Sequence, residues 1–407
     1  MDPARSRRRD EALQRTLRGF FLSAAAMDGG FFLILVAMPF KVLDLGGGAL
    51  ELGLVGAVGA LSYIVCAPLS GRWSDRGERA LLSLLGAAVL VATAVLAWLV
   101  RRVDLLIALQ ALMGLGKALY WPAVQATLGD LSPGTRRLPV LGRFNLSWSG
   151  GKTLGFALGG LLLGCCGFGT VYLTGAVIVV VAVIVLPRGG AVDRARGAVA
   201  AAGDAESPAA RPADQPERLR VFRAMGWIAN TAAAGAFGIL TYHLPQWFET
   251  RGWQPDRFGW FLGAVLAVQT VTFVLFTGRL KLAWSVWRLW APLLVTAAAV
   301  AAIPLLPRFA GLLALAPAIG FGCGVCYTAS IYYSLEAAAT RGRNAGIHES
   351  LVGAGSFLPP LLAGGLVRLG LGLEAPYLLA GALLIGGLVL QAALWTRAQR
   401  SSGTTLS

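Results

Sequence analysis

The sequence predicts an all-α membrane protein with twelve transmembrane helices in two pseudo-symmetric bundles of six. Of its 407 residues, 56% are hydrophobic and only 14% are charged, whereas about a quarter of an ordinary soluble chain is charged. Apolar runs of the length that crosses a bilayer, roughly 20 residues, recur along the chain. The second half also repeats the spacing of the first. Together these observations exclude a soluble globule.

The predicted spans are the apolar runs between charged breaks. They are 19–43, 52–69, 80–100, 105–128, 144–165, 171–186, 221–248, 258–277, 286–306, 309–333, 345–367 and 377–394. Residues 1–18 form an N-terminal tail, 19–186 and 221–396 the two bundles, and 397–407 a C-terminal tail. The segment 187–220 is rich in Ala, Pro, Arg, Asp and Gly, which predicts a flexible linker between the bundles.

Basic residues are distributed unevenly between the two sides of the membrane. The side with both tails and the linker has 26 Lys and Arg residues, and the opposite side has seven. The positive-inside rule therefore predicts a multi-pass protein of the plasma (inner) membrane with both termini in the cytoplasm. The formal charge of +15 does not indicate a nucleic-acid partner, because the charges lie between hydrophobic runs.

The two halves repeat each other. Gly30, Phe32 and Leu35 recur at an offset of 205 as Gly235, Phe237 and Leu240. At an offset of 204, a set of small residues and prolines in 142–160 matches one in 346–364. The set comprises Gly142, Gly151, Gly155, Gly159 and Gly160 in the first half and Gly346, Gly355, Pro359, Pro360 and Gly364 in the second. Two parallel repeats are typical of transporters, and small residues let membrane helices approach closely.

The loop GRWSDRGER after the second predicted span resembles the GxxxDRxGRR loop of the major facilitator superfamily. Gly71, Asp75, Arg76 and Arg79 align without gaps, and the second glycine stands one place early. The resemblance implies the twelve-helix fold of that family and a gating role for this loop, whose ion pairs would break when the bundles rock. The alternative is a basic membrane anchor with an incidental aspartate.

The span 144–165 resembles the family's antiporter signature Gx8Gx3GPx2GG, with Phe156 in the place of the proline. This resemblance, to the drug/proton antiporter group, implies efflux; the alternative is that the glycines serve packing alone. The span 105–128 departs from the family pattern, because Gln110 replaces an arginine and Met113 a glutamine, leaving Gly114 and Gly116. Either protons are coupled through other residues, or transport is not driven by protons.

Polar residues within the spans are the candidate substrate and proton pathway, because such groups are costly in a bilayer and normally face a cavity or a partner. The pathway residues are Asp28, Gln110, Lys117, Trp121, Gln125, Asn145, Lys152, Asn230, Gln269, Tyr327, His348 and Glu349. Asp28 is a candidate for reversible protonation or for contact with a substrate cation, and the alternative is a structural hydrogen bond. His348 and Glu349 either carry protons or form a capping cluster with basic neighbours. The lysines line the pathway or extend to the interface.

These features predict a transmembrane secondary transporter that moves a small organic or amphipathic compound by alternating access, with ion-coupled export. One alternative is a proton-coupled uptake symporter for a sugar or organic acid, and another is a non-transporting membrane sensor. The chain is not expected to be an enzyme, because its two histidines lie 105 positions apart and no catalytic cluster is evident. No cofactor or metal is expected. The expected partners are the substrate, protons as coupling ion and the lipid bilayer, with the monomer as the functional unit.

Overall fold

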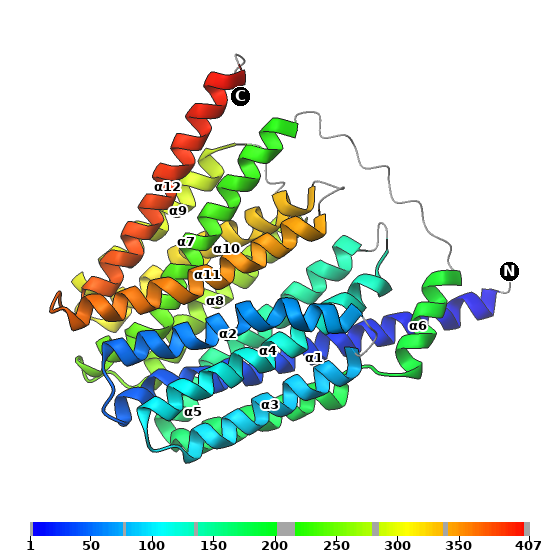
Figure 1. Ribbon diagram of the computed structural model, residues 1–407, viewed down its shortest axis with the longest axis horizontal. Helices are drawn as coiled ribbons and strands as arrows, with labels where there is room; N and C mark the ends of the chain where they lie inside the picture. Colours follow the sequence, from blue (N-terminus) through cyan, green and yellow to red (C-terminus); the bar gives the residue numbers. More distant parts are fainter. Residues whose placement is uncertain are drawn as a thin grey trace.

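The computed structural model describes residues 3–75, 79–133, 137–201, 216–278, 285–336 and 341–402, and the regular elements among them are helical (Figure 1). They are α1 (Pro3–Asp44), α2 (Ala49–Asp75), α3 (Arg79–Leu99), α4 (Val103–Leu131), α5 (Arg137–Val185), α6 (Gly190–Ala201), α7 (Pro216–Glu249), α8 (Pro255–Gly278), α9 (Trp287–Ala302), the short 3-10 helix η2 (Ile303–Leu305), α10 (Phe309–Glu336), α11 (Arg341–Arg368) and α12 (Ala375–Ser402). Helices suit this apolar chain because each satisfies its own backbone hydrogen bonds in lipid.

The predicted fold of twelve spans is confirmed, and two of the spans lie in α5, one on each side of a break in the helix. Ten of the described helices are long and apolar enough to cross a membrane, and α5 counts as one of them. A straight helix of its length would measure roughly 70 Å, more than twice the hydrocarbon core of about 30 Å. Gly167, with a φ of 77°, breaks α5 into two spans at a conformation that glycine adopts without strain. The remaining span is α7, which carries the polar residues Asn230 and His243.

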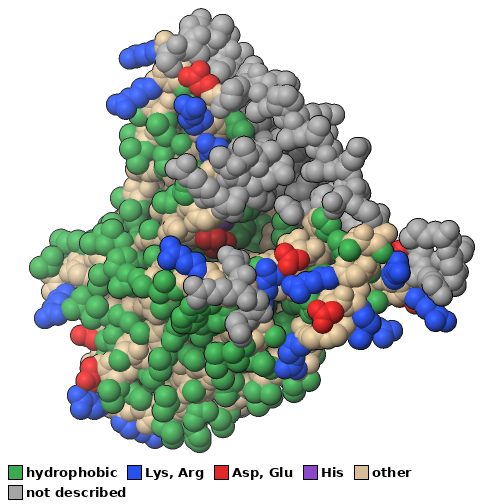
Figure 2. Space-filling model, turned by 45° about the vertical axis from the view of Figure 1, so that its right-hand side comes forward, with side chains coloured by type: hydrophobic (Ala, Val, Ile, Leu, Met, Phe, Trp, Pro, Cys, Tyr) green, Lys and Arg blue, Asp and Glu red, His purple; other side chains and the backbone are tan. Residues whose placement is uncertain are grey.

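The twelve spans form two bundles with the same internal packing. In the first bundle α1 packs on α5 and α2 on α4, and in the second α7 packs on α11 and α8 on α10. Between the bundles, α5 packs on α8 and α2 on α11. The bundles diverge toward the end of the molecule that carries both chain termini (Figure 1). Figure 2 shows a hollow between them and a broad band of hydrophobic side chains on the visible surface.

The expectation of a flexible linker over 187–220 is wrong for part of that segment. Residues 190–201 form the helix α6, which packs against α1 and α4. Its buried face consists of Val192, Ala195 and Ala198. These residues follow a helical spacing, which is hard to recognise in a segment where alanine is frequent at other positions too. Residues 202–215 lie outside the described part of the chain. The N-terminal tail is also helical from Pro3 and continues into the first span.

Glycines at every fourth position of α5 bring it close to α1. A Cβ atom on Gly151 would meet the carbonyl oxygen of Ala25, and one on Gly155 would lie 2.5 Å from that of Gly29. In the second bundle a Cβ on Gly355 would lie 2.5 Å from the carbonyl oxygen of Thr231. The glycine spacing therefore supports close packing within each bundle, as membrane helices require.

Replacing Gly151 with valine is expected to destabilise the first bundle by about 1–3 kcal/mol, because α1 and α5 must move apart. Gly150→Val is the matched control, since a Cβ there meets no atom within 4 Å. Thermal unfolding of the two variants in the same detergent measures the difference. Equal melting temperatures would show that the α1–α5 contact does not limit stability.

Candidate functional site

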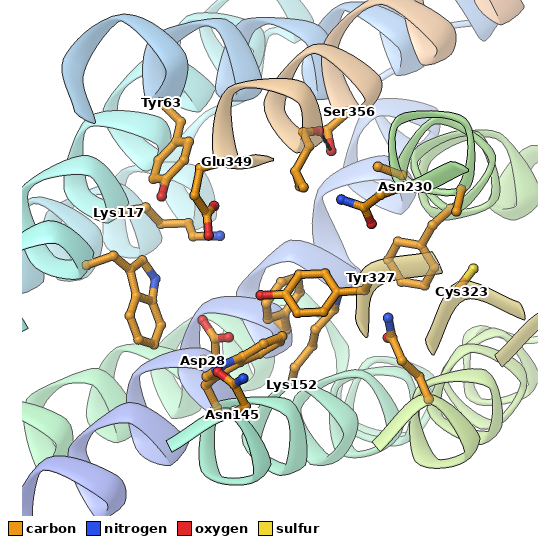
Figure 3. A pocket seen from close by; sticks show the side chains of 18 of the residues that line it. Asp28, Tyr63, Lys117, Asn145, Lys152, Asn230, Cys323, Tyr327, Glu349 and Ser356 are labelled. Atoms are coloured by element: carbon orange, nitrogen blue, oxygen red, sulfur yellow. Dashed lines mark hydrogen bonds between the residues drawn. The ribbon is translucent and has the colours of Figure 1, made fainter. Parts of the chain in front are cut away.

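A cavity of about 220 Å³ lies between the two bundles. Helices α1, α2, α4 and α5 of the first bundle and α7, α8, α10 and α11 of the second contribute to its lining (Figure 3). Ten of the twelve predicted pathway residues line it. They are Asp28, Lys117, Trp121, Gln125, Asn145, Lys152, Asn230, Gln269, Tyr327 and Glu349. Side chains far apart in the sequence thus surround one space.

Gln110 and His348, which were also predicted for the pathway, do not line this cavity. Gln110 is 1% exposed and lies against α2, where a Cβ on Gly59 would be 3.5 Å from its side-chain oxygen. His348 is buried and shares a 2.7 Å hydrogen bond between its Nδ1 and Oγ of Ser330. Its ring packs at 5.1 Å against Tyr327, so it lies behind a residue of the lining.

Four charged side chains line the cavity, and no ion pair joins any of them within the described residues. The lysines rest on aromatic rings instead. Nζ of Lys117 lies 4.5 Å from the ring centre of Phe31, and Nζ of Lys152 lies 4.4 Å from that of Phe237, which is cation–π geometry. Figure 3 shows Asp28 and Glu349 projecting from different sides of the open space. The cavity therefore offers separated charges of both signs.

Asp28 is the most enclosed of these groups, at 4% exposure. Its Oδ1 has no hydrogen-bond partner among the described residues. A buried polar atom without a partner is costly, so this oxygen is suited to bind a proton, a water molecule or a substrate donor. The alternative for Asp28 was a structural hydrogen bond to a neighbouring helix, and Oδ1 makes no such bond within the described residues.

Aromatic rings form much of the remaining wall, and sequence reasoning missed several lining residues. The residues missed were Phe32, Tyr63, Trp148, Ala233, Ala234, Phe237, Cys323, Val352 and Ser356. Trp148 donates a 3.0 Å hydrogen bond from Nε1 to Oδ1 of Asn145, and its ring lies 6.0 Å from that of Tyr327. Its position between Asn145 and Lys152 on one helical face was a signal that could have found it. The wall suits an organic molecule with an apolar body.

The cavity is closed at the end of the molecule away from the chain termini. There, a Cβ on Gly160 of α5 would lie 2.6 Å from Cα of Gly259 in α8. A Cβ on Gly53 of α2 would lie 2.6 Å from the carbonyl oxygen of Pro360 in α11. These two backbone contacts, one on each side of the pseudo-symmetry axis, hold the bundles together at this end.

The loop predicted to act as a gate is described in part. Nη1 of Arg79 forms an ion pair with Asp130 at the end of α4, and Arg196 of α6 reaches the same carboxylate at 3.3 Å. Gly71 faces open space. The side chain of Asp75 and the whole of Arg76 lie outside the described residues. Asp130 and Arg196 were not predicted, because only the fold brings α6 to this loop.

The curated relatives that resemble this chain match only part of it. Multidrug resistance protein 2 of Bacillus subtilis is 28% identical over 137 residues, which is 33% of this chain and 34% of that protein. Protein spinster of Drosophila melanogaster is 31% identical over 107 residues, 26% of this chain and 18% of that protein. The quinolone resistance protein NorA of Staphylococcus aureus is 23% identical over 133 residues, 33% of this chain and 34% of that protein. Each match spans about a third or less of either chain.

Solved transporter structures match over nearly the whole chain. PepTSo, a POT family transporter, superposes with a TM-score of 0.70 at 12% identity, covering 95% of this chain and 98% of that one. A bacterial homolog of the human lysosomal transporter Spinster, in an inward-facing and occupied conformation, gives 0.65 at 16% identity, covering 94% and 96%. At these identities the likeness shows the fold alone. The family model described as Major Facilitator Superfamily matches residues 20–358, and the chain therefore belongs to that superfamily as a membrane transporter rather than an enzyme.

Proposed function

We propose that this transporter exports a small organic or amphipathic compound from the cytoplasm by alternating access, with protons as the coupling ion. The observation that carries the proposal is the cavity between the bundles, which is closed at one end by the contacts of α5 with α8 and of α2 with α11. Rocking of the bundles would open this end and close the other, as in transporters built from two repeats.

The orientation we propose places both termini in the cytoplasm of a cell whose plasma membrane holds the protein. The distribution of Lys and Arg supports this orientation. The cavity would then open toward the cytoplasm in the present conformation. The functional unit that we propose is the monomer.

Proton coupling is assigned in this proposal to Asp28 and Glu349. They are the carboxylates of the described lining, one on α1 and the other on α11. Because they belong to different bundles, their distance from each other and from the lysines changes when the bundles rock. The proton affinity of each would then differ between the two conformations, which is the condition for coupling.

Export rather than uptake is favoured by two considerations. The first is the names of relatives, which include multidrug and quinolone resistance proteins. The second is the glycine series ending in Gly159 and Gly160, which resembles the antiporter signature apart from Phe156. An uptake symporter for a sugar or organic acid is the second candidate, since the described lining contains carboxylates and amide side chains such as Asn230 that suit hydroxyl groups.

The decisive test uses purified protein in liposomes that contain a pH-sensitive dye. Without an imposed gradient, a panel of cationic, anionic and zwitterionic compounds is added outside. An antiported compound is expected to make the lumen more alkaline as protons leave, and a symported compound to make it more acidic. Protein-free liposomes give the background. Uptake of a labelled compound without any change in luminal pH would contradict proton coupling, and acidification would favour the symporter.

A further inference from the structure

A second cavity, of about 420 Å³, lies on the first bundle between α1 and α6. We call it the basic cavity, and its lining is Ala12, Arg15, Thr16, Arg18, Gly19, Leu22, Val185, Pro187, Ala191 and Arg194. Three of these residues are arginines and none is acidic. The gating loop and the cavity between the bundles use none of these residues.

The fold holds the three arginines together. A Cβ on Gly19 would lie 2.5 Å from Cγ of Pro187, so the absence of a side chain there lets the segment after α5 lie on α1. Oγ1 of Thr16 donates a 3.3 Å hydrogen bond to the carbonyl oxygen of Ala191. Arg196, on the same helix, is tied to Asp130. Helix α6 is thereby fixed beside α1, and Arg194 is brought to Arg15 and Arg18.

The charges of the basic cavity are not neutralised by the protein. Nearby arginines do have acidic partners, for example Arg7 with Glu11 at 3.2 Å and Arg196 with Asp193 at 4.0 Å. Within the described residues, Arg15, Arg18 and Arg194 form no such pair. Three exposed like charges around one cavity repel one another, and a bound anion would relieve that repulsion.

The basic cavity lies at the boundary between polar and lipid-facing surface. Leu22, in its lining, is 62% exposed. Next to Val185 of the lining, Ile184 is 67% exposed, and Val177, two turns earlier on α5, is 61% exposed. Such residues face hydrocarbon in a membrane transporter, so the arginines stand at the depth of lipid headgroups.

We propose that the basic cavity binds the phosphate headgroup of an anionic phospholipid. The guanidinium groups of Arg15, Arg18 and Arg194 would hold the phosphate, whose geometry matches a planar fork of donors. The acyl chains would follow the exposed apolar surface of α1 and α5 past Leu22 and Ile184. A soluble phosphate would gain the first interaction and not the second. The site would fasten α6, and with it the end of the first bundle, to one leaflet.

The test measures lipid retained by the purified full-length protein in native mass spectrometry. Phosphatidylglycerol and phosphatidylcholine are titrated separately into the detergent-solubilised wild type and into the triple variant Arg15→Gln, Arg18→Gln, Arg194→Gln. Each arginine near anionic lipid contributes about a factor of five in affinity, so the triple variant should bind phosphatidylglycerol roughly 100-fold more weakly. Phosphatidylcholine should bind weakly to both proteins.

The matched control removes three other exposed arginines at the same end of the molecule, with Arg72→Gln, Arg397→Gln and Arg400→Gln. It should retain phosphatidylglycerol as the wild type does. An equal loss in this control, or full retention in the Arg15, Arg18 and Arg194 variant, would overturn the proposal. Displacement of the lipid by an equimolar amount of glycerol 1-phosphate would also overturn it, because the site would then recognise a soluble phosphate. Equal melting temperatures establish that both triple variants are folded.

Discussion

Asp28→Asn is expected to reduce pH-driven accumulation of substrate to the level of protein-free liposomes, and Glu349→Gln is expected to do the same. Each substitution replaces a carboxylate of the cavity, to which we assign proton binding, with an amide of nearly the same shape. Because we assign coupling to both carboxylates together, a variant that keeps only one of them should not let the pH gradient bias the return of the substrate-free transporter. Exchange of labelled for unlabelled substrate in the absence of a gradient needs no proton step and should continue in both variants.

Accumulation under a pH gradient and exchange without one are therefore measured side by side for each variant. Ser356→Ala is the matched control, because Ser356 lines the same cavity and does not titrate in the physiological range. It should retain pH-driven accumulation. If both carboxylate variants kept full accumulation, the assignment of coupling to Asp28 and Glu349 would be wrong. Loss of exchange together with accumulation would instead assign them to substrate binding.

Gly364→Leu is expected to abolish transport by holding the closed end of the cavity open. A Cβ at Gly364 of α11 would meet the carbonyl oxygen of Ala49 in α2, so a leucine separates the two bundles at their contact. Gly365→Leu places the same side chain one position along α11, where a Cβ meets no atom within 4 Å. That variant should transport at the wild-type rate.

Cys323 reports this opening directly, because its side chain lines the cavity. In a background with the other four cysteines changed to alanine, a membrane-impermeant maleimide is added on the side away from the chain termini. Gly364→Leu should increase the rate of Cys323 labelling at least tenfold, and Gly365→Leu should leave it unchanged. If Gly364→Leu protein is inactive but Cys323 is labelled at the unchanged rate, the leucine does not open the closed end of the cavity, and this explanation of the lost transport is wrong.

The twelve spans were predictable because each must supply roughly 20 apolar residues to the bilayer, a demand that composition reveals directly. Helix α6 was not predictable in this way. Its buried face has one valine and two alanines, a weak pattern within a segment rich in alanine. The break in α5 was predictable as well, because Gly167 lies between the predicted spans 144–165 and 171–186.

The candidate site was predictable where a single helix determines which side chains face the same way. Lys117, Trp121 and Gln125 follow a helical spacing and line the cavity together. Whether Tyr63 and Cys323 face the cavity depends on how α2 and α10 are rotated in the bundles. No local sequence pattern indicates that rotation. Gln110 shares the stripe of α4 but meets α2 instead, because the packing of neighbouring helices decides how far along a stripe a cavity extends.

The charges of the cavity have an electrical consequence. In their ordinary ionisation states, the two lysines of the described lining, Lys117 and Lys152, balance the two carboxylates, Asp28 and Glu349. Reorientation of the empty site then moves no net charge through the membrane voltage. A site that has taken up one proton carries one positive charge, for which 100 mV across the membrane is worth about 2.3 kcal/mol. For an uncharged substrate, voltage should therefore accelerate or retard only the proton-loaded half of the cycle.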